Sequence, residues 1–186
     1  MSNIFVVRHA HSQHNGKGLI VDVSDGSCLG LTDIGIEQAR DVSKQLAGIQ
    51  FDKVFVSPLK RAACTAKYIC DKEQVVDDRL RERHLTEYIG KRHEPQEQAE
   101  FDMRSLWFKS DQQPVGQNIE KMQDVRRRVY SFIEDIKSKY AGKNVLVVTH
   151  SGPCLYFKEY KFGVPADFDY LPYRTDNCEI IIIENE

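Results

Sequence analysis

The sequence predicts an α/β protein, a three-layer α/β/α sandwich built around a mostly parallel central sheet. Two observations predict this fold class. Runs of consecutive apolar residues, typical of strands buried on both faces, occur at 4–7, 53–57 and 145–149. Amphipathic helical patterns lie between these runs, so strands and helices alternate along the chain. The length of 186 residues suits one well-buried core, and we expect a single domain over residues 1–186.

The first half of the chain predicts two strands, each followed by a helix. Thr32 is a typical N-cap, and the residues after it carry apolar side chains at helical spacing. Ser57 and Pro58 combine a capping hydroxyl with proline at the first helical position, which predicts a second helix start. In order, the elements are a strand at 4–7, a loop over 16–30, a helix from Thr32 to about Gly48, a strand at 53–57 and a helix from Ser57 to Ile69.

The second half of the chain predicts the remaining strands and the longest helix. Three consecutive arginines, Arg126 to Arg128, lie on that helix and are interpreted as a solvated face. In order, the elements are a strand at 74–76, a charged loop over 77–84, a helix from Glu94 to about Phe108, a break at 110–116, a helix over 119–140, a strand at 145–149 and an edge or antiparallel strand at 180–183. Gly152 and Pro153 predict that His150 ends a strand beside a helix N-terminus.

Composition excludes several classes of protein. The formal net charge of -2 argues against a nucleic-acid partner, which usually requires a basic domain. The five cysteines are scattered and odd in number, and no signal peptide is evident, so we expect reduced thiols and a cytoplasmic location. The longest apolar run is far too short to cross a membrane. The sequence does not predict an oligomeric state.

Cationic and imidazole side chains follow three of the predicted strands. Arg8 and His9 come after the first strand, Arg61 after the second and His150 after the third. Because the carboxyl ends of parallel strands meet at one edge of a sheet, we expect these side chains to converge. Guanidinium groups bind phosphate oxygens in pairs and stay charged at every relevant pH. The sequence therefore predicts a pocket for a phosphoryl group.

Five segments in a fixed order resemble the histidine phosphatase superfamily, the phosphoglycerate mutase-like proteins. They are Arg8-His9-Ala10, Leu31 to Ala39, Ser57 to Ala66, Leu80-Arg81-Glu82 and Val147 to Gly152. The resemblance spans roughly residues 4–155 and implies a phosphoglycerate mutase-like fold. Departures from the family pattern include Ala10 and Ser151, where glycine is usual. No departure removes a charged catalytic group, so we expect activity.

The resemblance implies a role for each residue of the site. His9 would be the nucleophile that forms a phosphohistidine, which water then hydrolyses. Glu82 would be the general acid and base, although the nearby Glu87 is an alternative. The remaining expected roles are charge stabilisation by Arg8, Arg61 and protonated His150, phosphate binding by Ser12, Asn15 and the backbone N–H of Ser151, and contact with a second anionic group of the substrate by Lys91.

The expected function is hydrolysis of a phosphomonoester on a small phosphorylated metabolite or a phosphoprotein, with no metal ion or other cofactor. A 2,3-bisphosphoglycerate-dependent phosphoglycerate mutase is an alternative, although mutases of this family are generally longer. A second alternative is a non-catalytic phosphate-binding protein on the same fold. A metal site built on His9, His11 and His14 is a third, and the charge of Arg8 argues against it.

Overall fold

The computed structural model describes residues 3–13, 15, 30–84, 120–165 and 169–185. The predicted helix over 94–108 and the predicted break at 110–116 lie outside these residues. So does nearly all of the predicted loop over 16–30. None of the helices within the described ranges is both long enough and apolar enough to cross a membrane.

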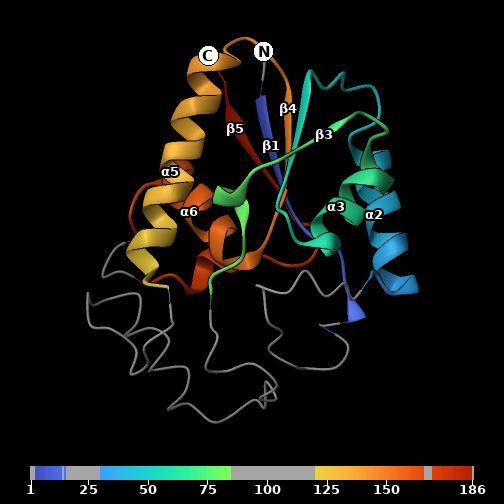
Figure 1. Cartoon of the computed structure of the whole chain (residues 1–186), viewed down its shortest axis with the longest axis horizontal. Coiled ribbons are helices and arrows are strands. Elements are labelled where there is room, and N and C mark those ends of the chain that lie inside the picture. The colour runs from blue at the N-terminus through green and yellow to red at the C-terminus, as the bar shows by residue number, and fades with distance from the viewer. Residues whose placement is uncertain (1–2, 14, 16–29, 85–119, 166–168, 186) are drawn as a thin grey trace.

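A five-stranded sheet forms the middle layer, in the order β3-β2-β4-β1-β5 (Figure 1). The first four strands in sequence are parallel to their neighbours, and β5 is antiparallel to β1 at the edge. This confirms both the mostly parallel sheet and the antiparallel edge strand. The bounds are β1 Asn3–Arg8, β2 Lys53–Val56, β3 Gln74–Val76, β4 Val145–Thr149 and β5 Ile180–Glu184.

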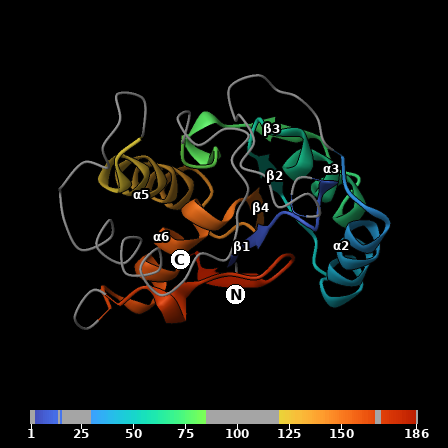
Figure 2. The same ribbon diagram turned by 90° about the horizontal axis from the view of Figure 1, so that it is seen from below.

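Helices cover both faces of the sheet, which gives the predicted three layers. Figure 2 shows α2 and α3 on one side of the strands and α5 and α6 on the other. The bounds are α2 Asp33–Gln45, α3 Lys60–Ile69, α5 Met122–Lys139 and α6 Ser151–Phe162. A short 3-10 helix over Asp78–Leu80 interrupts the predicted charged loop. Strands β1 to β4 run parallel, so their four carboxyl ends lie on one edge of the sheet.

Alternate residues of the central strands pack on opposite helical layers. Side chains that pack under α2 and α3 include Val7, Val56, Leu146 and Val148. Side chains that pack under α5 and α6 include Ile4, Val6, Val145 and Val147. Every one of these side chains is fully buried. Burial on both faces explains why β1 and β4 are continuous apolar runs and do not alternate with polar residues.

Two local predictions were wrong. Helix α3 begins at Lys60, three residues after the predicted capping serine, and its N-cap residue Leu59 makes no side-chain cap. The Ser57 hydroxyl instead bonds to His150, as described below. The prediction of a solvated face on α5 was wrong only in part: Arg126 and Arg127 are exposed, although Arg126 also pairs with the buried Glu159, whereas Arg128 is only 17% exposed and pairs with Glu120.

Candidate active site

The carboxyl ends of three neighbouring strands bring the predicted residues together. Backbone pairing continues one residue past β1 and β2: the His9 N–H donates to the Thr149 oxygen at 2.8 Å, and the Ser57 N–H donates to the Val148 oxygen at 3.0 Å. Because this register is shared, His9, Ser57 and His150 leave adjacent strands at nearly the same level. The two imidazole rings have their centroids 5.0 Å apart.

His9 is buried, with 3% of its surface exposed, and both of its ring nitrogens have partners. Nδ1 lies 2.8 Å from the backbone oxygen of Ala10, which can only accept a hydrogen bond. Nδ1 therefore carries the proton of the neutral ring. On the other side, Arg61 Nε donates to His9 Nε2 at 3.2 Å. The ring thus presents the Nε2 lone pair to the cationic side of the site.

The site contains two guanidinium groups: Arg61 lies at this lone pair, and Arg8 is close enough for its charge to act on Arg61 and His150. Burial lowers the pKa of Arg61, an effect that the Glu82 carboxylate opposes and that Arg8 reinforces. Arginine remains charged despite such a shift. Arg8 donates from Nη1 to the Thr175 backbone oxygen at 2.6 Å, and its buried Nε has no partner among the described residues. The site therefore holds two fixed positive charges, one with an unused donor.

His150 occupies the N-cap position of α6 and is completely buried. Its Nε2 lies 2.7 Å from the Ser57 hydroxyl, and its Nδ1 has no partner among the described residues. Burial holds the pKa of His150 well below its usual value, and the charges of Arg61, His9, Arg8 and Arg128 act in the same direction. These effects favour a neutral ring in the free protein, whereas the sequence led us to expect a protonated His150.

Glu82 lies against the first turn of α6. Its carboxylate accepts from the Gly152 N–H at 3.1 Å and from the Arg83 N–H at 2.8 Å. The first turn of a helix has free backbone N–H groups, and a carboxylate can accept hydrogen bonds from them. A Cβ atom on Gly152 would collide with Oε1 of Glu82. Glycine at 152 therefore permits the close approach of the carboxylate, and the tight turn that the sequence suggested is an ordinary helical turn.

Hydrogen bonds hold the chain after β1 against α3 and also link residues within that loop. The Ala10 N–H donates to the Thr65 hydroxyl at 3.0 Å, and that hydroxyl donates to the Arg61 oxygen at 2.7 Å. The backbone and the hydroxyl of Ser12 both donate to Oδ1 of Asn15, at 3.1 and 3.0 Å. Because Oδ1 is engaged, Asn15 would meet an anion through its Nδ2. Thr65 was not predicted to serve the site, although it lies inside one of the family segments.

The segment from Leu31 to Ala39 also acts on this loop. Thr32 caps α2, as predicted, by accepting from the Gly35 N–H at 3.2 Å. The Gln38 side chain accepts from the His11 N–H at 2.9 Å. A Cβ atom on Gly35 would collide with the backbone oxygen of His11, so only glycine lets the helix approach this closely. The motif thus holds the loop that follows the nucleophile strand.

The C-terminal segment supplies two contacts that sequence reasoning missed. Asn177 donates from Nδ2 to the His9 backbone oxygen at 2.6 Å, and the Thr175 oxygen accepts from Arg8. Buried Lys158 holds this segment by donating to the Arg174 oxygen at 2.9 Å and pairing with Glu179. No recurring pattern marks these residues in the sequence. Only the antiparallel pairing of β5 with β1 places them beside the site.

Several predicted residues lie outside the described part of the chain or apart from the pocket. Lys91, Glu87 and His14 fall outside the described residues. Ser151 is the first residue of α6, half-buried beside His150. His11 has its Nδ1 2.9 Å from the Thr32 hydroxyl, whereas His9 Nε2 faces a guanidinium. A cation at Arg61 opposes a dication at the same nitrogen, which disfavours the metal site on these histidines.

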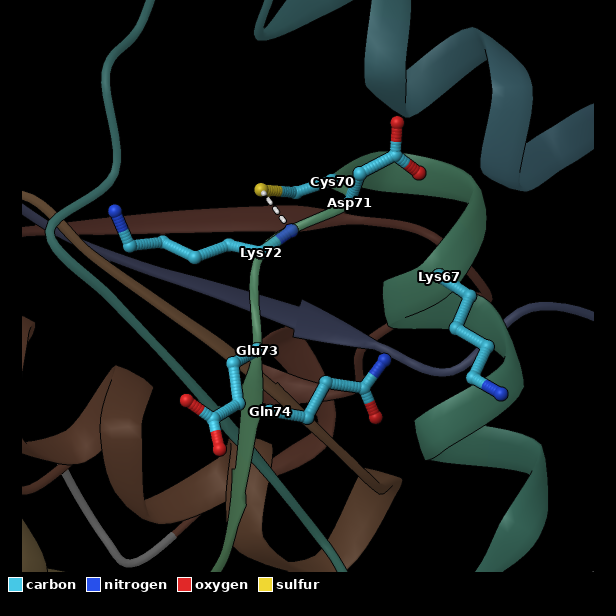
Figure 3. A pocket seen from close by; sticks show the side chains of 6 residues that line it. All are labelled: Lys67, Cys70, Asp71, Lys72, Glu73 and Gln74. Carbon is cyan, nitrogen blue, oxygen red and sulfur yellow. Dashed lines mark hydrogen bonds between the residues drawn. The ribbon is translucent and has the colours of Figure 1, made fainter.

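A surface depression lies away from these groups, between the end of α3 and the start of β3 (Figure 3). Its lining side chains carry both signs of charge, and the one hydrogen bond drawn there runs from the Lys72 N–H to the Cys70 sulfur at 3.4 Å. The lining residues are Lys67, Cys70, Asp71, Lys72, Glu73 and Gln74. None of them is a predicted site residue, so we assign the chemistry to the strand ends.

The arrangement at the strand ends suits the binding and transfer of a phosphoryl group. Two guanidiniums balance the charge of a phosphate dianion, and the His9 imidazole beside Arg61 offers a nucleophilic lone pair at Nε2. A carboxyl group near α6 could exchange a proton with a leaving oxygen. Each of these groups is held by a backbone or side-chain hydrogen bond, so little reorganisation is needed when an anion arrives.

Known proteins resemble the chain in sequence and in structure. A model described as the histidine phosphatase superfamily (branch 1) matches residues 4–186. Phosphoserine phosphatase 1 of Hydrogenobacter thermophilus is 29% identical over 190 residues, covering 100% of this chain and 88% of that protein. The 2,3-bisphosphoglycerate-dependent phosphoglycerate mutase of Thermoplasma acidophilum is 33% identical over 158 residues, which cover 82% of this chain and 72% of that protein. The crystal structure of the alpha-ribazole phosphatase from Shigella flexneri aligns with a TM-score of 0.77 at 27% identity. The alignment covers 98% of this chain and 90% of that one.

Proposed function

The chain belongs to the histidine phosphatase superfamily and hydrolyses phosphate monoesters, and we propose that it does so through a phosphohistidine formed on His9. One observation carries this proposal. The Ala10 oxygen holds the proton of the imidazole at Nδ1, so that the Nε2 lone pair points toward Arg61. A substrate phosphate drawn to that guanidinium would place its phosphorus next to the lone pair.

The two arginines would bind the transferred group. Arg61 Nε, which bonds to the nucleophile in the free protein, would exchange that acceptor for a phosphate oxygen. Arg8 would contribute its unpartnered Nε, because its Nη1 is already fixed on the Thr175 oxygen. Ser12, Asn15 and the backbone N–H of Ser151 would complete the phosphate contacts. Positioning and charge stabilisation of this kind supply most of the rate of phosphoryl transfer.

Glu82 would protonate the leaving oxygen and then, as a carboxylate, activate the water that hydrolyses the phosphohistidine. Its support is its location: the charge of Glu82 acts on Arg61, and its oxygens lie at the first turn of the helix that His150 caps. Glu87 remains the alternative donor. The two can be separated by replacing each with glutamine and comparing substrates whose leaving groups need a proton with those that do not.

We further propose a metal-independent, single-domain enzyme that acts on small phosphorylated molecules. The named relatives act on substrates of that kind. Metal independence is supported by the guanidinium at the nucleophilic nitrogen, where a dication would be repelled. A reducing, cytoplasmic location is supported by the free thiols of Cys64, Cys70, Cys154 and Cys178. EDTA should leave the hydrolysis of p-nitrophenyl phosphate unchanged, and a loss of activity that zinc or magnesium restores would contradict this.

The proposal is tested by trapping the covalent intermediate. Wild-type protein is mixed with a 32P-labelled phosphomonoester, quenched within milliseconds and divided between acid and alkali. We expect protein-bound label that acid removes and alkali spares, and none on His9→Ala. Tyr68→Ala serves as the control because it deletes an exposed ring on α3, where Tyr68 contacts Arg40 of α2, and it should label like wild type. Full hydrolysis by His9→Ala would refute the proposal.

A second candidate function is that of a 2,3-bisphosphoglycerate-dependent phosphoglycerate mutase, because the chain is similar to the Thermoplasma acidophilum enzyme of that name. Both activities share the phosphohistidine and differ in what accepts the phosphoryl group. Labelled phosphoenzyme is therefore chased with buffer alone and with buffer containing 3-phosphoglycerate. Release of inorganic phosphate at the same rate in both supports the phosphatase, and transfer of label to the phosphoglycerate supports the mutase.

A further inference from the structure

We propose that Ser57 fixes the tautomer of His150, so that His150 takes part in phosphoryl transfer as a neutral donor from Nδ1. This rests on the proposed function, in which His150 faces the transferred group. Ser57 is then a positioning residue, because its hydroxyl would act on the phosphoryl group only through the imidazole. The sequence suggested a different role for Ser57, as the cap of a helix that in fact begins at Lys60.

The hydrogen bonds of the Ser57 hydroxyl determine which way its proton points. The side chain is completely buried, accepts from the Leu59 N–H at 3.2 Å and lies 2.7 Å from Nε2 of His150. A hydroxyl has one proton to donate, and Nε2 is the only acceptor in hydrogen-bond contact with it in the described chain. If Nε2 carried a proton, two buried groups would be left unpaired, the Ser57 hydroxyl proton and the Nδ1 lone pair, whereas the opposite arrangement leaves only the Nδ1 N–H unpaired. The hydroxyl therefore donates to Nε2.

The other ring nitrogen then carries the proton of the neutral imidazole. Nδ1 of His150 is buried and has no partner within the described residues. A buried donor without an acceptor is unfavourable, and a phosphate oxygen would remove that penalty on arrival. The opposite tautomer would turn a lone pair toward the anion, which is repulsive. The same tautomer thus satisfies Ser57 and prepares the site for phosphate.

The charges around the ring also favour a neutral donor. Arg8 on β1, Arg61 on α3 and Arg128 on α5 all act on His150, together with the ring of His9. The Glu82 carboxylate bonds to the first turn of α6, the helix whose N-cap is His150. With His150 neutral, the two guanidiniums Arg8 and Arg61 balance a phosphate dianion, whereas a third positive charge would have no counterpart.

Nuclear magnetic resonance of the unmodified protein tests the tautomer directly. The full chain is labelled with 15N-histidine, and long-range proton–nitrogen spectra are recorded between pH 6 and 8, with and without orthovanadate. The signals of His150 are identified by their loss in His150→Gln. We expect Nδ1 protonated and Nε2 unprotonated under all of these conditions. A proton on Nε2, or on both nitrogens at pH 7, would overturn the proposal, and neither result depends on whether the protein turns over substrate.

Variants of Ser57 test whether the tautomer of His150 affects the rate of phosphoryl transfer to His9. Ser57→Ala should move part of the His150 proton to Nε2 and slow single-turnover phosphorylation of His9 by about 10- to 100-fold, less than the 100- to 1,000-fold typical of a deleted donor. Ser57→Thr keeps the hydroxyl and should restore the tautomer. Ser43→Ala is the matched control, since the Ser43 hydroxyl donates to the Ile69 oxygen away from the site. A wild-type His150 spectrum in Ser57→Ala would overturn the role of Ser57, while loss of the phosphohistidine in wild type would instead refute the function.

Discussion

Replacing Gly152 with alanine should remove general acid catalysis while leaving the fold in place. The added Cβ would collide with Oε1 of Glu82, the far end of a flexible side chain, so the carboxylate must move by about 1 Å. Gly152 is helical and has no positive φ, so its backbone accepts alanine. Alanine gains about 1 kcal/mol of helix propensity, and the bond from the Gly152 N–H to the carboxylate, about 1.5–3 kcal/mol, is weakened. Stability should therefore fall by no more than about 2 kcal/mol.

The effect on the rate depends on the leaving group. General acid catalysis contributes about 100- to 10,000-fold, so Gly152→Ala should lower kcat for β-glycerophosphate, an alkyl ester, by at least about 100-fold. The rate for p-nitrophenyl phosphate should fall by only about threefold, because nitrophenolate leaves without a proton. Gly30→Ala is the matched control, since its Cβ would meet no atom within 4 Å. An unchanged kcat for β-glycerophosphate in Gly152→Ala would refute the assignment of Glu82 as a positioned acid.

Two further predictions concern His9 and His150. Asn177→Ala removes the 2.6 Å hydrogen bond to the His9 oxygen and should lower kcat by about 10- to 100-fold, because the ring of His9 would be misplaced. Asn144→Ala, at the opposite end of β4, is the control and should leave kcat unchanged. Equal rates for the two variants would contradict the prediction. The depressed pKa of His150 means that the unfolded chain binds the proton first, so the free energy of unfolding should fall as pH drops below about 7, by up to about 1.4 kcal/mol per pH unit, until the folded pKa is reached. Urea unfolding at pH 7.5 and 5.5 should show a smaller difference for His150→Gln than for wild type, and equal differences would contradict the buried neutral ring.

The sequence predicted the layers and the central pocket because both depend on short-range patterns. Continuous apolar runs marked β1 and β4, and the residues directly after them had to meet at one edge of a parallel sheet. Contacts set by long-range pairing could not be predicted in this way. Asn177 reaches His9 only because β5 returns antiparallel to β1, and no motif marks its position.

The misassigned residues show what competes with local rules. Ser57 followed by proline has the features of a capped helix start, but its hydroxyl satisfies His150 across the sheet, and α3 begins without a side-chain cap. The arginines at 126 and 128 have the features of a solvated face. The first binds the buried Glu159, whose other partners are the hydroxyls of Tyr130 and Tyr170. Ser57 and Arg126 thus bind polar groups in the folded interior, although the sequence assigned the first to a helix cap and the second to solvent.

The charge of the pocket follows from which of its groups can titrate. Arg8 and Arg61 stay positive at every relevant pH, while His150 is kept neutral by burial and by those same arginines. A phosphate dianion would therefore meet two positive charges, which balance its own charge, and one uncharged donor. By leaving His9 Nε2 to bind the anion, Arg61 would at the same time uncover the proposed nucleophile. Phosphate binding and activation of the His9 imidazole would then be a single event. A protonated His150 would bind phosphate more tightly but would slow the hydrolysis of the phosphohistidine intermediate.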